Sequence, residues 1–485
     1  MSVKIKDRPE EIYIGIDYGT RFTKVAVRGE RQEPEVWTGS SGGPLIPSIV
    51  YITADGDVLP WPEAPSAWAT KIEYLKMLFS RRSPTRRPSG GTTKIEYLKM
   101  LLASPHDGQF EIPASVLAGH ERELVVKALA ALFLSEVIRR VQKSEREKPH
   151  LRNANIRWIV NVGVPVEHYD ASEKLRVFRE VASVAYTWAE LPPPDLKVSA
   201  LVRAYQEQAE IDPNTTGASV FPELAAALSE HIRDPNTPEG IFGFCDIGGG
   251  TIDGAIYRIN NKEWVNGPPY KKSEDRIPLA ILSAKLANLG AALVARSLVR
   301  KPGGSLPAAE ELALLLRVEK LLIEKQGTPA NTQERATELL KQYESEFKAD
   351  IQTYVRNFVT VARMKLSAIG NTFADPVLRR KIELRFFLAG GGAESGWYKT
   401  ALGFDLTGNP QDRQAFDGVE KLRLETVKPP PGFRGAEFPR FLIARGLARS
   451  PDDLEVVSRC LPSNNPSREP PEQEPPPPIQ LMYDD

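Results

Sequence analysis

The sequence predicts an α/β protein built as two lobes, and three observations support this prediction. Residues 12–27 and 241–257 each have the pattern of a strand, a tight glycine-containing turn and a second strand. Between them, residues 121–141 carry apolar side chains at three- and four-residue steps, which predicts an amphipathic helix. A length of 485 residues allows two to four domains or one large two-lobed unit.

The second hairpin carries the most specific motif of the chain, DIGGGTID at residues 246–253. Its three consecutive glycines, Gly248, Gly249 and Gly250, leave the turn without a Cβ atom, so backbone N–H groups can approach an anion closely. Asp246 and Asp253 flank the turn and would repel a bare phosphate. A phosphate that carries Mg²⁺ would instead be held by carboxylates acting through water. The alternative is an ordinary glycine-rich hairpin without a ligand.

The first hairpin repeats this arrangement. A buried-strand pattern over residues 12–17 ends at Asp17 and runs into a turn that contains Gly19 and Thr20. Thr251 closes the later turn in the same way as Thr20 closes this one. Two facing turns that each present one Asp and one Thr could grip a triphosphate and its metal from both sides.

Composition excludes several classes of function. Lys+Arg and Asp+Glu are equal at 63 each, so no excess charge predicts binding to nucleic acid or to an anionic membrane. Two cysteines and five histidines without metal-ligand spacing argue against a disulfide framework and a zinc site. Residues 1–11 lack the apolar stretch of a secretory signal, and the longest apolar run, 128–134, is too short to span a bilayer. We therefore expect a cytoplasmic protein.

The two hairpins together resemble the phosphate motifs of the superfamily of actin, sugar kinases and DnaK-type heat-shock chaperones. The second Asp of the later motif, Asp253, makes it more similar to DnaK-type and bacterial actin-like members than to sugar kinases. Four further segments resemble the chaperones in the right order, at residues 42–51, 163–166, 221–228 and 438–448. The resemblance implies a two-lobed actin-like ATPase fold, in which each lobe is a mixed, five-stranded type of sheet flanked by helices, with small inserted subdomains.

The resemblance also implies domain boundaries. Lobe one would span 1–240 with a small subdomain inserted at about 41–115, and lobe two would span 241–450 with a helical subdomain at about 280–370. Within the latter, residues 279–299 have the pattern of two helices broken at Gly290. Residues 451–485, rich in proline from 462 to 478, predict a disordered tail and leave no room for a chaperone's peptide-binding domain.

One segment is duplicated: TKIEYLKML at residues 70–78 recurs unchanged at 93–101. This identity indicates a recent tandem duplication or a cloning artefact. Divergent chaperone relatives have a Lys-x-Leu-Leu segment near this place, and its lysine contacts the γ-phosphate. Lys99 is similar to that lysine and Lys76 is its rival, whereas either could be an ordinary solvated lysine. Residues 221–228 resemble the first connecting motif with Pro and Glu exchanged, which implies that Glu223 orders the attacking water.

The resemblance reaches the adenosine side as well. Arg363 and Ser367 match a chaperone segment that stacks on and hydrogen-bonds adenosine. The turn formed by Gly390, Gly391 and Gly392 is similar to the adenosine motif. Glu394 stands where the chaperones carry the arginine that packs on adenine, so adenine specificity is less secure than phosphate binding.

We therefore predict a slow ATPase that binds ATP or ADP with Mg²⁺. Asp17, Lys99, Glu223 and Asp246 would be catalytic, and Asp17 and Asp246 would hold the metal mainly through water. The leading hypothesis is a chaperone-like nucleotide switch that acts on a protein partner. The alternatives are an actin-like filament former, which would self-associate, and a small-molecule kinase.

Overall fold

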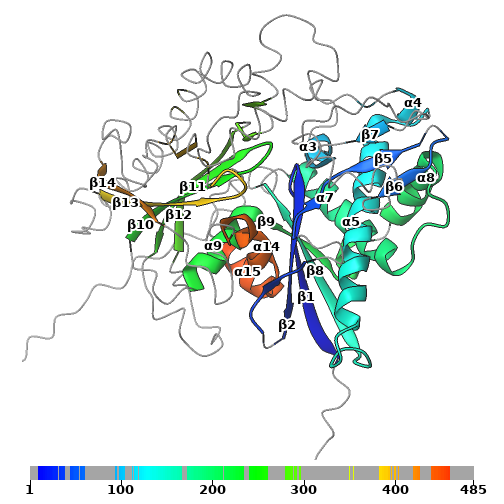
Figure 1. The fold of residues 1–485 in the computed structure, drawn as a ribbon, viewed down its shortest axis with the longest axis horizontal. Coiled ribbons are helices and arrows are strands. Elements are labelled where there is room, and N and C mark those ends of the chain that lie inside the picture. The colour runs from blue at the N-terminus through cyan, green and yellow to red at the C-terminus, as the bar shows by residue number, and fades with distance from the viewer. Residues whose placement is uncertain are drawn as a thin grey trace, which may run out of the picture.

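The computed structural model describes residues 9–30, 32–38, 44–53, 55–60, 93–95, 98–103, 112, 114–117, 119–165, 172–210, 212–233, 240–259, 279–287, 289–291, 294–295, 349, 353, 382–393, 395, 398–399, 402, 419–425 and 438–458. These residues form a mixed α/β protein, as predicted. Two large sheets lie side by side with helices between them and beyond them (Figure 1).

The first sheet has the order β3-β2-β1-β8-β9, with β4 paired to β2. β1 pairs with β2 antiparallel and with β8 parallel, and β8 pairs with β9 parallel. The alternating and continuous apolar runs of the sequence become these strands because their side chains are buried on the sheet faces. The strands are β1 Glu10–Asp17, β2 Phe22–Gly29, β3 Glu35–Val36, β4 Ile46–Pro47, β8 Ile156–Val164 and β9 Ala218–Pro222.

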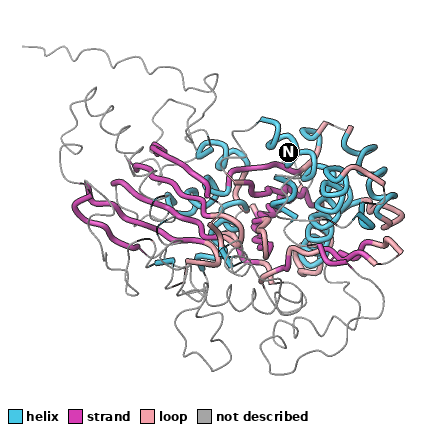
Figure 2. Tube along the Cα trace, turned by 90° about the horizontal axis from the view of Figure 1, so that it is seen from above, coloured by secondary structure: helices cyan, strands magenta, loops and turns pink. Residues whose placement is uncertain are grey.

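The second sheet has the order β12-β11-β10-β13-β14, which is the same strand order as in the first sheet. It again begins with an antiparallel hairpin, β10–β11, and continues with parallel strands on the other side of β10. Figure 2 shows these strands at the end of the molecule opposite most of the helices. They are β10 Gly240–Ile247, β11 Ile252–Ile259, β12 Leu279–Ala287, β13 Ile382–Ala389 and β14 Val419–Glu425.

The helices cover the first sheet and separate it from the second. α5 and α7 pack against each other and complete the main apolar core, and α9, α14 and α15 lie between the two sheets (Figure 1). The helices are α3 Leu98–Ala103, α4 Ala114–Leu117, α5 Arg122–Arg146, α7 Ser172–Glu190, α8 Val198–Ala209, α9 Glu223–Arg233, α14 Leu442–Leu447 and α15 Pro451–Ser458, with 3-10 turns at Pro213–Thr215 and Phe438–Phe441.

α9 and α14 approach each other closely because small side chains line their contact. A Cβ added at Gly446 would lie 1.9 Å from the backbone oxygen of Ala226, so only glycine fits there. Asn161 of β8 fixes the end of α14 by donating from Nδ2 to the carbonyls of Leu447 and Arg449 at 2.7 and 2.9 Å. The two helices therefore form one tightly packed unit between the sheets.

A small three-stranded sheet with the order β6-β5-β7 stands beside the first sheet. Its strands are β5 Val50–Ile52, β6 Val58–Pro60 and β7 Thr93–Ile95. The backbone before α8 is joined to β6, since Val58 N–H donates to the Leu196 carbonyl and Val198 N–H donates to the Gly56 carbonyl, at 2.8 and 3.1 Å. These bonds attach the small sheet to the segment that leads into α8, one of the helices beside the first sheet.

Two predictions are wrong. Residues 279–287 form the strand β12, which pairs with β11, rather than the first of two helices. A short apolar run fits a buried strand as well as a helix, and here pairing along the sheet edge decides between them. Residues 451–458 form α15 rather than the start of a disordered tail. Its proline stands at the first helical position and Asp453 N–H donates to Ser450 Oγ at 3.3 Å, which is typical of a helix start. Most of 280–370 and all of 459–485 lie outside the described residues.

Candidate functional site

The turn of the first hairpin is fixed by Ser48. Gly19 N–H donates to the Asp17 carbonyl at 2.9 Å and closes the turn, while Ser48 Oγ donates to the Gly19 carbonyl at 2.7 Å. Ser48 N–H also donates to the Arg21 carbonyl at 3.0 Å, and the Ser48 and Thr23 hydroxyls share a hydrogen bond of 2.9 Å. Carbonyl oxygens of the turn are thus held by Ser48.

Asp17, at the end of β1, is paired with a lysine that the sequence analysis did not identify. Lys24 stands directly opposite Asp17 in the β1–β2 ladder, and its Nζ lies 2.6 Å from Asp17 Oδ2. Both side chains are largely buried, at 14% exposed for Lys24 and 4% for Asp17. Lys24 therefore adds a second ammonium group to the predicted phosphate site.

The turn of the second hairpin is held from behind by the backbone that follows β12. Gly248 N–H donates to the Thr251 carbonyl at 2.9 Å and closes the turn. Gly290 N–H donates to the Gly250 carbonyl and Ala291 N–H to the Gly248 carbonyl, both at 3.1 Å. A Cβ at Gly290 would lie 2.4 Å from the backbone carbon of Gly250, so the two segments are in direct contact. Gly290 thus positions the turn, a role that the sequence analysis did not assign to it.

The carboxylate of Asp246 is enclosed by the end of β13. A Cβ added at Gly390 would lie 2.2 Å from Asp246 Oδ1, and Gly390 has a φ of +79°, which favours glycine. Gly392 N–H donates to the Ile247 carbonyl at 2.9 Å and ties this second glycine turn to β10. A Cβ at Gly391, in contrast, would meet no atom of the described residues within 4 Å. The predicted adenosine turn therefore lies directly against the second hairpin, and the described part of the chain leaves space beside its central residue.

Lys99 and Glu223 form a buried ion pair between two helices. Lys99 belongs to the short helix α3, and Glu223 is the first residue of α9, directly after the edge strand β9. Lys99 Nζ donates to Glu223 Oε1, and both side chains are below 10% exposed. A Cβ at Gly163, at the end of β8, would lie 2.9 Å from Glu223 Cγ, so this strand also fixes the carboxylate.

The two turns meet at this ion pair. A Cβ added at Gly250 would lie 2.9 Å from Met100 Sδ and 3.0 Å from Thr20 Oγ1. Met100 is the neighbour of Lys99 on α3, and Thr20 belongs to the first turn. Residues from both hairpins and from α3 are therefore in contact, although they are far apart in the sequence.

The charges of the site act on one another. Burial raises the pKa of the Asp246 carboxyl to about 7; Lys24 and Lys99 oppose this shift, while Asp17 and Glu223 add to it. Burial also raises the pKa of Glu223, against the pull of Lys99. Burial lowers the pKa of Lys99, but the negative charges of Glu223 and Asp17 outweigh this and the pKa is raised. Carboxylates outnumber ammonium groups here, so the site attracts positive charge.

Asp246 is the residue that fits a metal best. Its Oδ1 is buried and has no hydrogen-bond partner among the described residues, whereas Asp17 Oδ2 already accepts a bond from Lys24. Within the described part of the chain, no three His, Cys, Asp or Glu side chains gather closely enough to hold an ion directly. The residues therefore fit an ion that uses one or two carboxylates and keeps several waters, as Mg²⁺ does.

The predicted residues of the phosphate site are thus found together, and those of the adenosine site only in part. The structure brings together residues from both hairpins, α3, α9 and β13: Asp17, Gly19, Thr20, Lys99, Glu223, Asp246, Gly248, Gly249, Gly250, Thr251, Gly390, Gly391 and Gly392. Lys76, Arg363, Ser367 and Glu394 lie outside the described residues.

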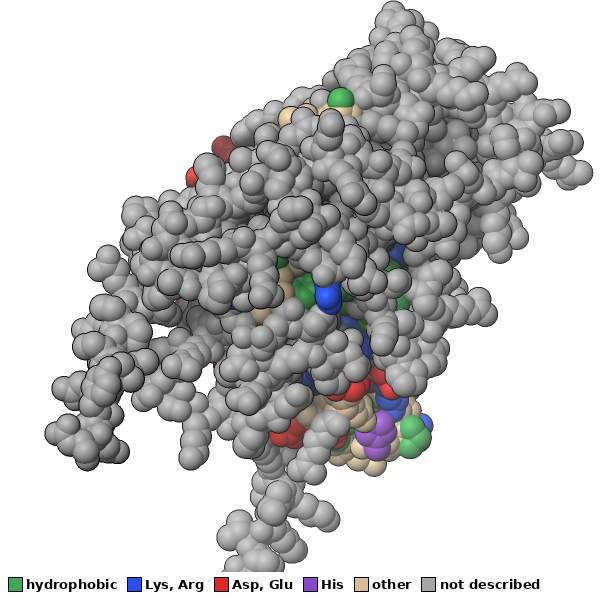
Figure 3. Space-filling model, turned by 90° about the vertical axis from the view of Figure 1, so that its left-hand side faces the viewer, with side chains coloured by type: hydrophobic (Ala, Val, Ile, Leu, Met, Phe, Trp, Pro, Cys, Tyr) green, Lys and Arg blue, Asp and Glu red, His purple; other side chains and the backbone are tan. Residues whose placement is uncertain are grey.

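Comparison with known proteins adds no family: no protein-family model and no curated protein matches this chain. None of the helices that the structure describes is both long and apolar enough to cross a membrane. On the face shown in Figure 3, visible acidic and basic side chains lie next to one another at the lower edge and are not separated by sign.

Proposed function

We propose that this protein binds Mg²⁺–ATP between its two glycine turns and hydrolyses it slowly, as a nucleotide switch for a protein partner. The observation that carries the proposal is the Lys99–Glu223 ion pair at the point where Gly250 of one turn faces Thr20 of the other. The shared strand order of the two sheets also supports it. The fold we infer is a two-lobed ATPase of the actin type, similar to the DnaK-type chaperones and cytoplasmic like them.

In this proposal the two turns bind the phosphates. The N–H groups of Gly19 and Gly248 close the two turns, so the remaining backbone N–H groups of these turns would donate to the β- and γ-phosphate oxygens, because glycine lets the backbone come close. Lys24 and Lys99 supply positive charge on the side of the first hairpin. Bound Mg²⁺ would neutralise phosphate charge, and Asp246, with Asp17, would hold it through its waters. Positioning and electrostatic stabilisation account for most of the catalysis of phosphoryl transfer.

Glu223 would orient the attacking water, and Lys99 would control when it can do so. The two side chains are bonded to each other in this structure. A γ-phosphate competes with Glu223 for the Lys99 ammonium group, since both are anionic. Once Lys99 turns to the phosphate, the Glu223 carboxylate can accept a hydrogen bond from water in line with the scissile bond. Hydrolysis and phosphate release would restore the ion pair.

α9 would carry the change from the site to the second sheet. It starts at Glu223, and its buried residues Leu224 and Leu228 belong to one apolar cluster with Phe242 and Phe387 of the second sheet. A movement of Glu223 would therefore change the packing of α9 against both large sheets. On the adenosine side, no atom in the described ranges would lie within 4 Å of a Cβ at Gly391, which supports room for a ligand there, and Arg363 and Ser367 would complete that site by the resemblance.

The test is ATP turnover by the purified protein with and without Mg²⁺, with light scattering recorded on the same sample. We expect slow Mg²⁺-dependent hydrolysis without a rise in scattering. Glu223→Gln should lower turnover by about 10²–10³-fold, and so should Lys99→Met in a chain that also carries Lys76→Met. The matched controls Glu190→Gln and Lys143→Met change exposed residues and should leave it unchanged. ATP-dependent scattering would favour the filament former, and Mg²⁺-independent turnover or none would contradict the proposal.

A further inference from the structure

The proposed function uses Lys99 from the second copy of the duplicated segment and gives the first copy no role. Residues 93–101, the second copy, form β7 and the first part of α3, whereas residues 70–78, the first copy, lie outside the described residues. We propose that the place occupied by the second copy also accepts the first copy of the same chain. The two copies would then compete for one position in the fold. We call this position the seat, and it is formed by β5, α5, Glu223 and Gly250.

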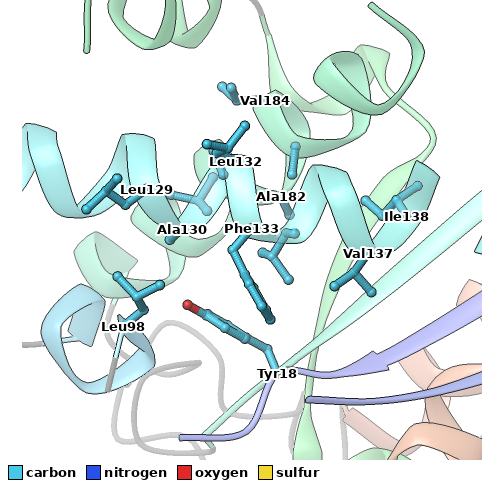
Figure 4. Close-up of a cluster of buried hydrophobic side chains, with 14 of the residues drawn as sticks. Tyr18, Leu98, Leu129, Ala130, Leu132, Phe133, Val137, Ile138, Ala182 and Val184 are labelled. Atoms are coloured by element: carbon cyan, nitrogen blue, oxygen red, sulfur yellow. The ribbon is translucent and has the colours of Figure 1, made fainter. Parts of the chain in front are cut away.

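The apolar contacts of the seat depend only on residues that both copies contain. β7 pairs antiparallel with β5, and Ile95 stands opposite Val50. Ile95, Leu98 and Leu101 are 3%, 0% and 1% exposed. In Figure 4, Leu98 of α3 lies beneath Leu129 and Ala130 of α5 and next to Tyr18. The first copy has Ile72, Leu75 and Leu78 at the corresponding positions, so it can fill the same apolar space.

The polar contacts are repeated as well. Lys99 reaches Glu223, and Met100 lies against the second glycine turn. Lys76 and Met77 are their counterparts in the first copy. The exchange would therefore present Lys76 to Glu223 in place of Lys99. Only this consequence for the lysine rests on the proposed function, since the seat itself is defined by packing.

Chain length allows either copy to reach the seat. β6 and β7 lie on either side of β5 and run in the same direction, so the connection must cross two strand spacings, about 10 Å, and return along a short strand of about 10 Å. Residues 61–69 would make this connection for the first copy and reach up to about 30 Å. With the first copy in the seat, the long connection would follow the occupying copy and lead to α4, instead of preceding it. Closure depends only weakly on length, so the exchange changes its cost little.

The residue that follows each copy decides which copy is favoured. Leu102 continues α3 and is 4% exposed, whereas Phe79 follows the first copy. A larger side chain in a filled position strains the packing, which favours the second copy by about 5- to 150-fold. The first copy would thus be the minor occupant of the seat in the native protein.

Thermal unfolding of the full chain tests this exchange with three variants. Leu98→Asp puts a charge into the seat and would normally be severely destabilising. We expect it to lower the midpoint by no more than about 5 °C, because the first copy replaces the second. Leu75→Asp alone should change it by less than about 1 °C, and the double variant should lose at least about 10 °C or fail to fold. If Leu98→Asp behaves like the double variant, the exchange does not occur.

Two further measurements show which molecule supplies the segment in the seat, and test the proposed function independently of the exchange. Rescue of Leu98→Asp that requires a dimer and disappears on dilution would assign the seat to a second molecule and overturn exchange within one chain. In Leu98→Asp, Lys76→Met should lower the remaining ATP turnover at least tenfold, while in the wild-type background it should lower turnover less than twofold. Absence of turnover in every variant would contradict the proposed function, and the unfolding midpoints would still decide the exchange.

Discussion

β1–β2 and β10–β11 are hairpins of one geometry with opposite charge partners. Asp17 is the last residue of β1 and Asp246 the last but one of β10, a glycine turn follows each strand, and the residue seven positions after each Asp stands directly opposite it. In the first hairpin this residue is Lys24, which bonds Asp17 at 2.6 Å. In the second it is Asp253, so Asp246 faces another carboxylate across the ladder. Like charges directly opposite are destabilising, whereas opposite charges attract.

The difference indicates how the site divides its tasks. In the first hairpin, Asp17 is neutralised within the fold by Lys24, which in the proposed function would lie near the phosphates. In the second, Asp246 Oδ1 has no hydrogen-bond partner among the described residues, and burial raises the pKa of Asp246 to about 7 against the opposing charges of Lys24 and Lys99. A bound cation would supply the missing charge. In the proposed function, the metal would therefore lie nearer the second hairpin than the first.

The largest expected effect on stability comes from a substitution at Gly390, which directly follows β13 and lies against Asp246. Gly390→Ala should destabilise the protein by about 3 kcal/mol, because φ is +79° and the new Cβ would lie 2.2 Å from Asp246 Oδ1. Gly391→Ala is the matched control, since its Cβ would meet no atom of the residues that the structure describes within 4 Å, and it should change stability by less than about 0.5 kcal/mol. Urea unfolding measures both. Equal effects would mean that β13 does not enclose the carboxylate.

The raised pKa of Asp246 predicts that Mg²⁺–nucleotide binding depends on pH. Below a pKa of about 7 the carboxyl holds a proton, which a nearby cation must displace. Affinity should therefore weaken by up to about tenfold per pH unit as the pH falls from 7 to 5. Titration calorimetry with Mg²⁺–ADP measures this, and Asp246→Asn should remove the dependence. A pH-independent affinity would show that the metal is held elsewhere.

The smallest expected effect on stability comes from removing the hydroxyl group of a buried tyrosine, Tyr18 next to β1 or Tyr257 in β11. Tyr18 stacks on Phe133 with ring centroids 5.8 Å apart, and its hydroxyl has no hydrogen-bond partner among the described residues (Figure 4). The Tyr257 hydroxyl instead bonds His231 Nδ1 at 3.1 Å. Tyr257→Phe should cost about 1 kcal/mol, while Tyr18→Phe should be neutral or slightly stabilising. Thermal unfolding separates the two, and a loss for Tyr18→Phe would reveal a partner in the rest of the chain.

The sequence predicted the elements of the site better than their partners. Asp17, Glu223 and Asp246 were found because each stands beside a glycine or proline signal at an element boundary. Lys24 was missed because a lysine within an alternating strand is usually solvated, and only the ladder register places it against Asp17. The repeated seven-residue spacing, Asp17 to Lys24 and Asp246 to Asp253, was a signal that could have identified it.

The parts that sequence did not predict depend on contacts made elsewhere in the fold. β12 is a strand because β11 offers it a free edge, which local periodicity does not record. Gly290 matters because its backbone meets that of Gly250, again a contact between distant segments. α15 forms where the capping residue Ser450 precedes a proline, although the composition beyond it indicates disorder.

Asp17 and Asp246 occupy equivalent positions in the two hairpins, and we expect their ionised carboxylates to affect stability in opposite directions. One measurement tests this directly. Urea unfolding of Asp17→Asn and Asp246→Asn is compared with wild type at pH 8 and pH 4.5, without metal or nucleotide. Asp17→Asn should lose about 2–3 kcal/mol at pH 8, because Lys24 is left largely buried without its counter-ion.

Asp246→Asn should have the opposite sign at pH 8. A carboxyl whose folded pKa is about 7 binds its proton more tightly in the native state than in the unfolded one, so wild-type stability falls as the pH rises from about 4 to 7. The variant avoids this loss and should gain about 2 kcal/mol at pH 8 and much less at pH 4.5. If both variants lose stability at pH 8, Asp246 is already compensated within the fold, and the proposed division between the two hairpins is wrong.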